Sequence, residues 1–207
     1  LSTDFLVIDT EGKDVLSEIA IFNAQGQLAY EAFVQGHDSN DVIRLHVKPL
    51  ADILHDLLPL IAGKTLVFHY AEHDVELLKK SFKQLQLPFP AIQTDCTYLR
   101  AKLFFPDLTS YSLDYLSKHF ALKVDNHYFN SNAAHTARYD AAFTHQLYRK
   151  LMEKPDLNQN IPAPNPFCDS RVDNPFQQHV DLKSVYQDEF NLLKSILTAI
   201  KADPNHQ

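Results

Sequence analysis

The chain opens with short apolar segments separated by polar turns, a pattern typical of strands. Four apolar residues in a row, Phe5–Ile8, predict a buried strand. Ser17–Asn23 and Leu28–Val34 carry strand-favouring residues on either side of AQGQ, a sequence suited to a hairpin turn. Together these segments predict three consecutive antiparallel strands.

The apolar positions then change from the period of a strand to the period of a helix. Within PLADILHDLLPLIAG, the apolar side chains recur on one helical face. They are Leu50, Ile53, Leu54, Leu57 and Leu58. Gly63 suits the end of this helix, and Pro59 weakens its last turn.

The next part of the chain alternates strands and helices. Thr65–His69 predicts a fourth strand followed by a helix to about Gln84, and a short fifth strand is expected around Ile92. Further helices are expected over Cys96–Leu103, Ser112–Phe120 and His135–Met152. This order predicts an α/β domain in which helices cover the faces of a mixed five-stranded sheet.

The composition changes at Pro155, after which prolines and asparagines become frequent. This change predicts an irregular strap or linker, and an amphipathic helix is expected from Leu182 to about Lys201. We therefore expect a folded domain over residues 1–154 and a Pro-rich linker with a C-terminal helix over residues 155–207. The apolar face of that helix requires a covering surface. This surface is either the back of the domain, a second copy of the chain, a protein partner or a fused domain.

Composition and net charge argue against some classes of protein. The 207 residues are 45% hydrophobic, as in a globular protein with a core, and no run approaches the roughly 18 apolar residues that span a bilayer. We therefore expect a soluble, cytoplasmic protein. The chain begins with Leu1 and not Met, as in a processed chain or a domain of a longer protein. Its net charge of -7 argues against a protein that passively coats DNA or RNA, but it allows an enzyme that meets phosphates through metal ions.

Acidic residues interrupt the apolar pattern in several places. Asp9 and Glu11 stand at the end of the first predicted strand, and their spacing puts both side chains on one side. Such carboxylates repel each other unless a cation or a shared proton lies between them. Asp74 falls in the first turn of a helix that follows a strand, and His135 precedes Asp140 by five positions. Taken singly, an acid at a helix start is more often a cap than a ligand.

In this order, the motifs resemble those of the DEDDh 3′→5′ exonuclease superfamily. The resemblance covers roughly residues 4–152, and it includes the segments DCTYLRAKLF and YSLDYLSKHF between the acidic motifs. It implies a ribonuclease-H-like fold, with which the pattern of strands and helices agrees. It also implies an enzyme that releases nucleotides from a 3′ end, with single-stranded DNA or RNA as the expected partner.

The resemblance implies a role for each motif residue. The acids that would bind metal are Asp9, Glu11, Asp74 and Asp140. They would hold two divalent ions, Mg²⁺ or Mn²⁺, which prefer oxygen ligands. The ions would lie about 3.5–4 Å apart and promote attack of a water on the phosphodiester. His135 would act as the general base, since an imidazole can accept a proton near neutral pH.

Further residues are expected to contact the terminal nucleotide. The backbone of Thr10 and Gly12 would approach it, because a glycine leaves room, and His69 and Tyr70 would hold its base or sugar. The second motif departs from the family pattern His-Asn-x-x-Phe-Asp, since Tyr70 stands in place of the Asn and His73 in place of the Phe. This departure leaves the preference for DNA or RNA open.

Two other functions stay open on the sequence alone. His69–His73 reads HYAEH, which matches the H-x-x-E-H motif of zinc metallopeptidases. However, His69 is expected to end a strand, so the two imidazoles would not share a helical turn. The second alternative is a catalytically silent domain of the same fold that binds nucleic acid or acts as a scaffold. Such a domain would be expected to lose acidic motif residues, and this chain retains them all.

Overall fold

The computed structural model describes residues 4–36 and 46–153 of the 207-residue chain. These residues lie in the first of the two units into which the chain divides, Leu1–Cys168 and Asp169–Gln207. The predicted Pro-rich linker, the C-terminal helix and the division at residue 154 lie outside the described residues, so they stay predictions.

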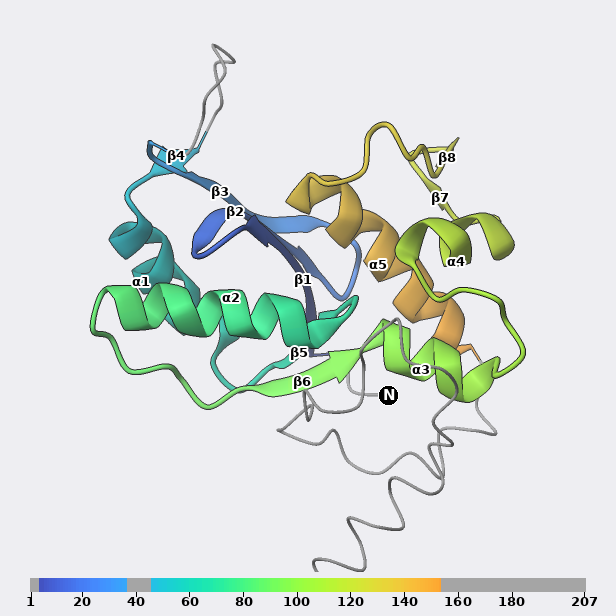
Figure 1. Cartoon of the computed structure of the whole chain (residues 1–207), viewed down its shortest axis with the longest axis horizontal. Coiled ribbons are helices and arrows are strands. Elements are labelled where there is room, and N and C mark those ends of the chain that lie inside the picture. The colour runs from blue at the N-terminus through green and yellow to red at the C-terminus, as the bar shows by residue number, and fades with distance from the viewer. Residues whose placement is uncertain (1–3, 37–45, 154–207) are drawn as a thin grey trace, which may run out of the picture. The chain divides into compact units, whose positions relative to one another are not determined.

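A six-stranded mixed sheet forms the centre of the domain (Figure 1). Its strands are β1 (Phe5–Gly12), β2 (Leu16–Asn23), β3 (Leu28–Val34), β4 (Val47–Lys48), β5 (Thr65–Phe68) and β6 (Gln93–Cys96). They follow the order β4-β3-β2-β1-β5-β6 across the sheet. β1, β2 and β3 pair antiparallel, whereas β4 runs parallel to β3, β5 to β1 and β6 to β5. The predicted mixed sheet is confirmed, with the short strand β4 in addition.

Helices cover both faces of this sheet, as Figure 1 shows. α1 (Leu50–Ile61) and α2 (Ala71–Gln84) pack on one face, and α5 (Ala137–Met152) packs on the other. Because β1 and β5 run parallel, their carboxyl ends meet at the same edge of the sheet. α2 begins directly after β5, so its first turn lies at this edge.

Shorter elements pack against α5 on the side away from the sheet. They are α3 (Thr97–Phe104), α4 (Leu113–His119) and the hairpin of β7 (Lys123–Val124) and β8 (His127–Tyr128). The helices expected before Pro155 are all present, with ends that differ by two residues at most. In the part of the chain that the structure describes, no helix combines the length and the apolar character needed to cross a membrane.

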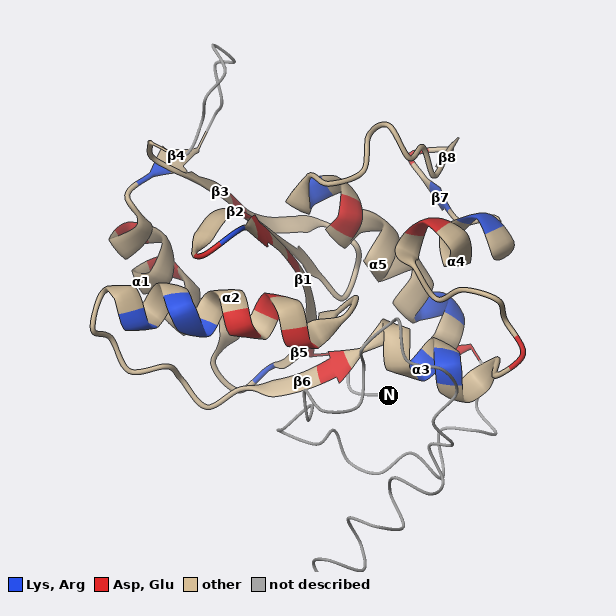
Figure 2. Cartoon of the chain, viewed as in Figure 1, with Lys and Arg blue, Asp and Glu red and all other residues tan. Residues whose placement is uncertain are grey.

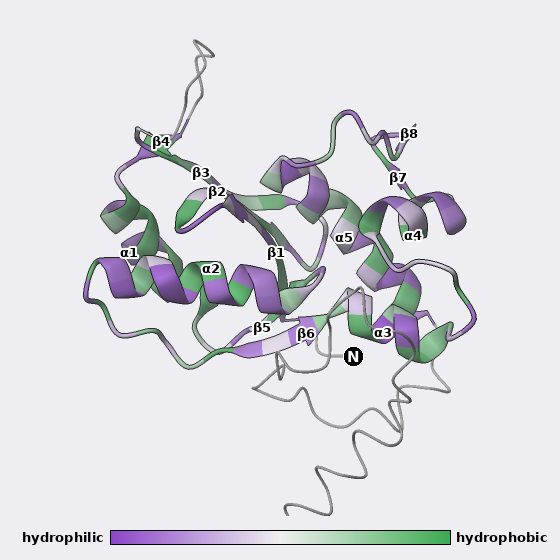
Figure 3. Ribbon diagram, viewed as in Figure 1, coloured by the Kyte–Doolittle hydropathy of each residue, from purple (hydrophilic) through white to green (hydrophobic). Residues whose placement is uncertain are grey.

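Alternation along β1 divides its side chains between two cores. Leu6 and Ile8 pack beneath α1 and α2, whereas Val7 packs beneath α5. Apolar and polar residues alternate along α1 and α2 in Figure 3, as expected for helices with one buried face. A further cluster, which includes Leu116 and Phe143, joins α4 to α5.

β1 continues past its apolar run. The strand extends to Gly12, so Asp9 and Glu11 lie at its end, as the sequence predicted. Asp9 pairs with Ala20, and Glu11 pairs with Glu18 on β2. Backbone hydrogen bonding thus carries the strand past the apolar run and through both carboxylate residues.

Candidate functional site

Asp9 and Glu11 lie on the face of β1 that is turned toward α5. Val7 packs beneath that helix, and alternation along the strand places the side chains of Asp9 and Glu11 on the same side as Val7. Both acidic residues are half-buried. The strand therefore presents two carboxylates to the same space.

A β-bulge follows directly after Glu11. The pairing of β1 with β2 shifts between Glu11 and Gly12, which leaves Ser17 as the extra residue. The Ser17 hydroxyl donates a hydrogen bond to the Glu11 carbonyl oxygen at 2.9 Å. At Gly12 an added Cβ would lie 2.1 Å from the Val15 carbonyl oxygen, so the turn has room only for glycine. The end of β1 is thus fixed by local backbone geometry.

Asp74, in the first turn of α2, meets β1 from the opposite face of the sheet. Its Oδ1 accepts hydrogen bonds from the Thr10 N–H at 2.9 Å and from the Thr10 hydroxyl at 2.8 Å. Asp74 is 3% exposed and Thr10 is also buried. Thr10, which was expected to approach the nucleotide through its backbone, therefore uses both its N–H and its hydroxyl to orient Asp74.

His135 and Asp140 lie at the start of α5. His135 has a left-handed backbone with a φ of 69°, and its N–H donates to Asp140 Oδ2 at 3.1 Å. The other oxygen of Asp140, Oδ1, is buried and has no hydrogen-bond partner among the described residues. A buried oxygen of this kind is costly unless water or a cation meets it.

The packing of α5 on the sheet brings these groups to the carboxylates of β1. One ligand atom each of Glu11, His135 and Asp140 lies within 4.8 Å of the other two. Asp9 is close enough to Asp74 and Asp140 for their charges to affect its titration. Figure 2 shows acidic residues on β1 and on the first turns of α2 and α5. The structure thus assembles the five motif residues from three elements.

The assembly raises the pKa values of its carboxyl groups. Burial raises the pKa of Asp9 well above its usual value, and the charges of Asp74 and Asp140 raise it further. Burial raises the pKa of Asp74 to about 7, although the hydrogen bonds from Thr10 oppose this shift. Burial is also the main cause of the raised pKa of Glu11 and of Asp140. Crowded carboxylates with an unpaired buried oxygen fit a site for hard divalent cations.

His69 and Tyr70 lie between β5 and α2. The Nδ1 atom of His69 is 2.8 Å from Thr97 Oγ1, and burial lowers the pKa of its imidazole to about 4, so the ring is neutral at physiological pH. Tyr70 stands at the N-cap of α2 with a left-handed backbone, and its ring lies 5.2 Å from that of Tyr98. His69 is therefore half-buried and held by Thr97, and contact of either residue with a substrate stays a prediction.

The geometry does not support the zinc-peptidase alternative. His69 precedes α2 and its ring contacts Thr97, whereas His73 is exposed on the first turn of the helix. The two imidazoles thus do not form a pair on one helical turn, which the motif requires. Within the described ranges, the side chains close enough to hold a metal ion are those around His135.

Glu18 is a buried acid near the site that the sequence analysis did not single out. It is 6% exposed and lies opposite Glu11, and its Oε1 accepts a hydrogen bond from the Ala137 N–H at 2.8 Å. Its charge contributes to the raised pKa of Asp9 and of Glu11. The signal that could have revealed it is a glutamate inside the apolar strand sequence SEIAIFN.

An aromatic group beside Tyr70 was also not predicted. The Tyr98 ring lies 6.1 Å from that of Tyr111, and Lys102 Nζ lies 4.4 Å from the centre of the Tyr98 ring. These side chains place aromatic faces and a cation next to the start of α2. Tyr98 and Lys102 stand four positions apart on α3, but Tyr70 and Tyr111 come from other segments, so no local spacing indicates the whole group.

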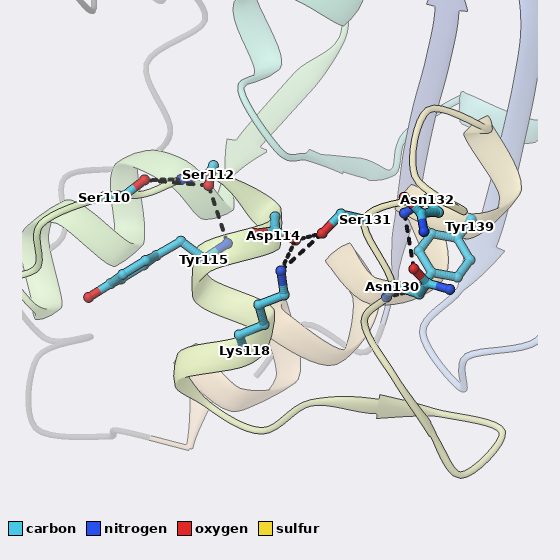
Figure 4. A network of polar contacts seen from close by, with 9 residues as sticks. All are labelled: Ser110, Ser112, Asp114, Tyr115, Lys118, Asn130, Ser131, Asn132 and Tyr139. Atoms are coloured by element: carbon cyan, nitrogen blue, oxygen red, sulfur yellow. Dashed lines mark hydrogen bonds and ion pairs between the residues drawn. The ribbon is translucent and has the colours of Figure 1, made fainter.

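Polar contacts hold the segment that leads into α5 (Figure 4). The Ser131 hydroxyl donates to Asp114 Oδ1 at 2.6 Å, which joins this segment to α4. The Asn130 N–H donates to the Tyr139 hydroxyl at 2.6 Å, which joins it to the first turn of α5. The approach to His135 is therefore anchored on two helices.

Comparisons with known proteins match the chain to an exonuclease family. A family model described as an exonuclease, RNase T, matches residues 43–148. DNA polymerase III subunit epsilon of Rickettsia prowazekii is 30% identical over 154 residues, which cover 67% of this chain and 64% of that protein. The epsilon subunit of Aquifex aeolicus is 27% identical over 105 residues, which cover 51% of this chain and 48% of that protein. The chain thus spans less than two thirds of the length of either relative.

A solved structure supports the fold. The structure titled exonuclease X in complex with 5′ overhanging duplex DNA superposes with a TM-score of 0.52 at 20% sequence identity. The superposition covers 73% of this chain and 93% of that chain. The architecture of a mixed sheet with helices on both faces is therefore shared with this protein.

Proposed function

The chain belongs to the RNase T family of exonucleases, and we propose from this that it is a metal-dependent 3′→5′ exonuclease acting on DNA or RNA. The observation that carries the proposal is the convergence of Glu11, His135 and Asp140 within 4.8 Å, next to Asp9 and Asp74. Relatives named as DNA polymerase III subunits support nucleic acid as the substrate class.

The carboxylates would hold two ions, Mg²⁺ or Mn²⁺. The residues proposed to bind them are Asp9, Glu11, Asp74 and Asp140. When bound, such ions favour ionisation of the attacking water and offset the charge on the leaving 3′ oxygen. The raised pKa values of these acids and the unpaired Oδ1 of Asp140 support this assignment, because a cation would relieve both.

His135 is proposed as the general base. It would take a proton from the water that attacks the last phosphodiester phosphorus. A new phosphorus–oxygen bond forms while the bond to the 3′ oxygen of the preceding nucleotide breaks, and a nucleoside 5′-monophosphate leaves. The ring of His135 is exposed, so the proton can pass to solvent, and the hydrogen bond between its backbone and Asp140 keeps the residue near the site.

Substrate positioning is proposed for both sides of the site. The backbone of Gly12, at the end of β1, is proposed to approach the terminal nucleotide, although the space of its missing Cβ is taken by the Val15 carbonyl oxygen. Tyr70 and Tyr98 offer ring faces for stacking a base, and Lys102 offers a charge for a phosphate. A single-stranded 3′ end fits this mode, because its bases are free to stack. The cytoplasmic location and a protein partner for the C-terminal helix stay predictions.

Oligonucleotides labelled at the 5′ end test the proposal. Single-stranded DNA, duplex DNA and RNA are incubated with the protein and Mg²⁺, and the products are separated by length. The label should stay on strands that shorten stepwise from the 3′ end, and excess EDTA should stop the reaction. Immediate release of a labelled mononucleotide, internal cleavage, or activity that persists in EDTA would each contradict the proposal.

A further inference from the structure

Glu18 is charged and buried, and the proposed reaction does not use it. It is 6% exposed in the middle of β2 and lies directly opposite Glu11 in the antiparallel pair. Opposite residues in such a pair point to the same face of the sheet. The Glu18 carboxylate therefore lies on the side covered by α5, where a buried charge requires hydrogen bonds.

The start of α5 provides such a hydrogen bond. Glu18 Oε1 accepts from the Ala137 N–H at 2.8 Å, across 119 positions of sequence. Ala137 is the first residue of α5 and is fully buried, so water does not reach its N–H. Thr136, at the N-cap, forms no cap hydrogen bond through its side chain. The carboxylate from β2 thus replaces the N-cap side chain, and its charge suits the positive end of the helix dipole.

Ala137 stands between the motif residues His135, which precedes α5, and Asp140, in its first turn. His135 lies two positions before it and Asp140 three positions after it, and the His135 N–H is bonded to Asp140 Oδ2. A shift of the backbone at Ala137 would therefore move both residues. It would move them relative to Glu11, whose ligand atom now lies within 4.8 Å of theirs.

We propose that Glu18 is a positioning residue that sets the distance between the carboxylates of β1 and the His135–Asp140 pair. It does so by holding the start of α5 against β2, next to Glu11. The inference rests on the proposed function, since it concerns the geometry of the same site. In this role Glu18 contacts neither substrate nor metal. It acts through the hydrogen bond that its carboxylate oxygen accepts from Ala137.

Two substitutions separate the acceptor of Glu18 from its charge. Glu18→Met keeps the length of the side chain and removes the acceptor. It should lower kcat on a 5′-labelled oligonucleotide by about 10–100-fold, leave KM unchanged, and weaken Mn²⁺ binding to the free protein by a similar factor. Glu18→Gln keeps a carbonyl oxygen at the same reach, so its kcat and its Mn²⁺ affinity should stay within about threefold of wild type.

Tyr148→Phe is the matched control. It removes the hydrogen bond from the Tyr148 hydroxyl to Asp95 Oδ2, 3.0 Å long, toward the other end of α5. A general loss of stability in α5 would affect this variant as well. Its kcat and Mn²⁺ affinity should match wild type at a temperature at which circular dichroism shows all the variants folded.

A folded Glu18→Met protein with wild-type kcat and Mn²⁺ affinity would overturn the positioning role. An equal loss in Glu18→Gln would also overturn it, because the charge would then be the property required. If Glu18→Met does not fold, Glu18→Asp must show the same loss, since it keeps the charge but shortens the reach. A wild-type protein inactive on every oligonucleotide would instead contradict the proposed nuclease function, and the Mn²⁺ affinities would still decide the role of Glu18.

Discussion

His135 lies where two chemical roles are available. Its ring is exposed, its backbone N–H is bonded to Asp140, and a ring nitrogen lies within 4.8 Å of carboxylate oxygens of Glu11 and Asp140. At this range an imidazole can act on a nearby water, or it can bind a metal ion itself. The two roles differ in what is lost when the ring is removed.

His135→Ala should slow turnover by about 10²–10⁴-fold, the usual contribution of a general base. Mn²⁺ affinity, measured by electron paramagnetic resonance, should stay at the wild-type value because the carboxylates remain. His73→Ala is the control, since His73 is exposed on α2 and outside the group around Glu11. If Mn²⁺ binding is lost together with the His135 ring, the residue is a ligand and not the base.

The acidic residues and the histidine of the motifs could be selected as candidate site residues from their order and spacing in the sequence. Asp74 alone carried no such signal, since an acid at a helix start is commonly a cap. Glu18 could not be predicted, because its place depends on the register of β1 with β2 and on the bulge at Ser17. The contact between Glu18 and Ala137 also requires the docking of α5, a long-range event that local patterns do not contain.

The turn between β1 and β2 controls where β1 ends. The register shift after Glu11 and the close approach of Gly12 to Val15 allow the chain to reverse direction within a few residues. A Cβ at Gly12 would come closest to the backbone carbonyl group of Val15, which cannot move aside as a side chain can, so the strand itself would have to shift. Such a shift would carry Glu11 with it.

Gly12→Ala should therefore lower both stability and activity. We expect a loss of about 2–3 kcal/mol in the free energy of unfolding, at the upper end of ordinary substitutions. We also expect a loss in kcat of about tenfold or more, as for other disturbed supports of a metal site. Urea unfolding and the oligonucleotide assay measure the two effects.

Gly63→Ala is the control for this prediction. Gly63 also has a positive φ, 72°, but no atom lies within 4 Å of an added Cβ. It should cost only the strain of the left-handed backbone, about 1–2 kcal/mol, with kcat unchanged. Equal effects of the two substitutions would show that the close approach at Gly12 is unimportant.

The helices and most strands could be predicted because each spans enough residues to display a period. α1, α2 and α5 have 12, 14 and 16 residues and one clear buried face each. β4 and the hairpin of β7 and β8 could not be predicted, because strands of two residues have no period.

The buried acids give the metal-free domain a pH-dependent stability. Burial raises the pKa of Asp74 to about 7 and the pKa of Asp9 well above its usual value, whereas an unfolded Asp titrates near about 3.9. Between about pH 4 and about pH 7 the folded form therefore holds more protons than the unfolded form. The free energy of unfolding should fall as the pH rises through this window.

Bound divalent ions should restore the stability that the domain loses as the pH rises, because they offset the carboxylate charges that protons neutralise at lower pH. Saturating Mn²⁺ should raise Tm by about 5–10 °C at about pH 7.5, and by less than half of that at about pH 5.5. Asp74→Asn should bring the Mn²⁺-induced rise in Tm at about pH 7.5 closer to the rise at about pH 5.5. Asp107→Asn, at an exposed acid outside the site, should leave the two rises as different as in the wild type. An equal effect of Mn²⁺ at both pH values in the wild type would contradict the coupling of protons and metal at these acids.

The most direct test of the account compares the wild type with Asp9→Asn on one 5′-labelled oligonucleotide in Mg²⁺. Asp9 lies on β1 within reach of the charges of Asp74 and Asp140, so its carboxylate is central to the proposed metal site. The wild type should shorten the strand from its 3′ end. Asp9→Asn should be slower by about 10³-fold or more, as a loss of several kcal/mol of electrostatic stabilisation requires. The metal-free variant should melt at or above the wild-type temperature, because a repelling charge is gone. A folded Asp9→Asn protein that degrades the strand at the wild-type rate would contradict the account.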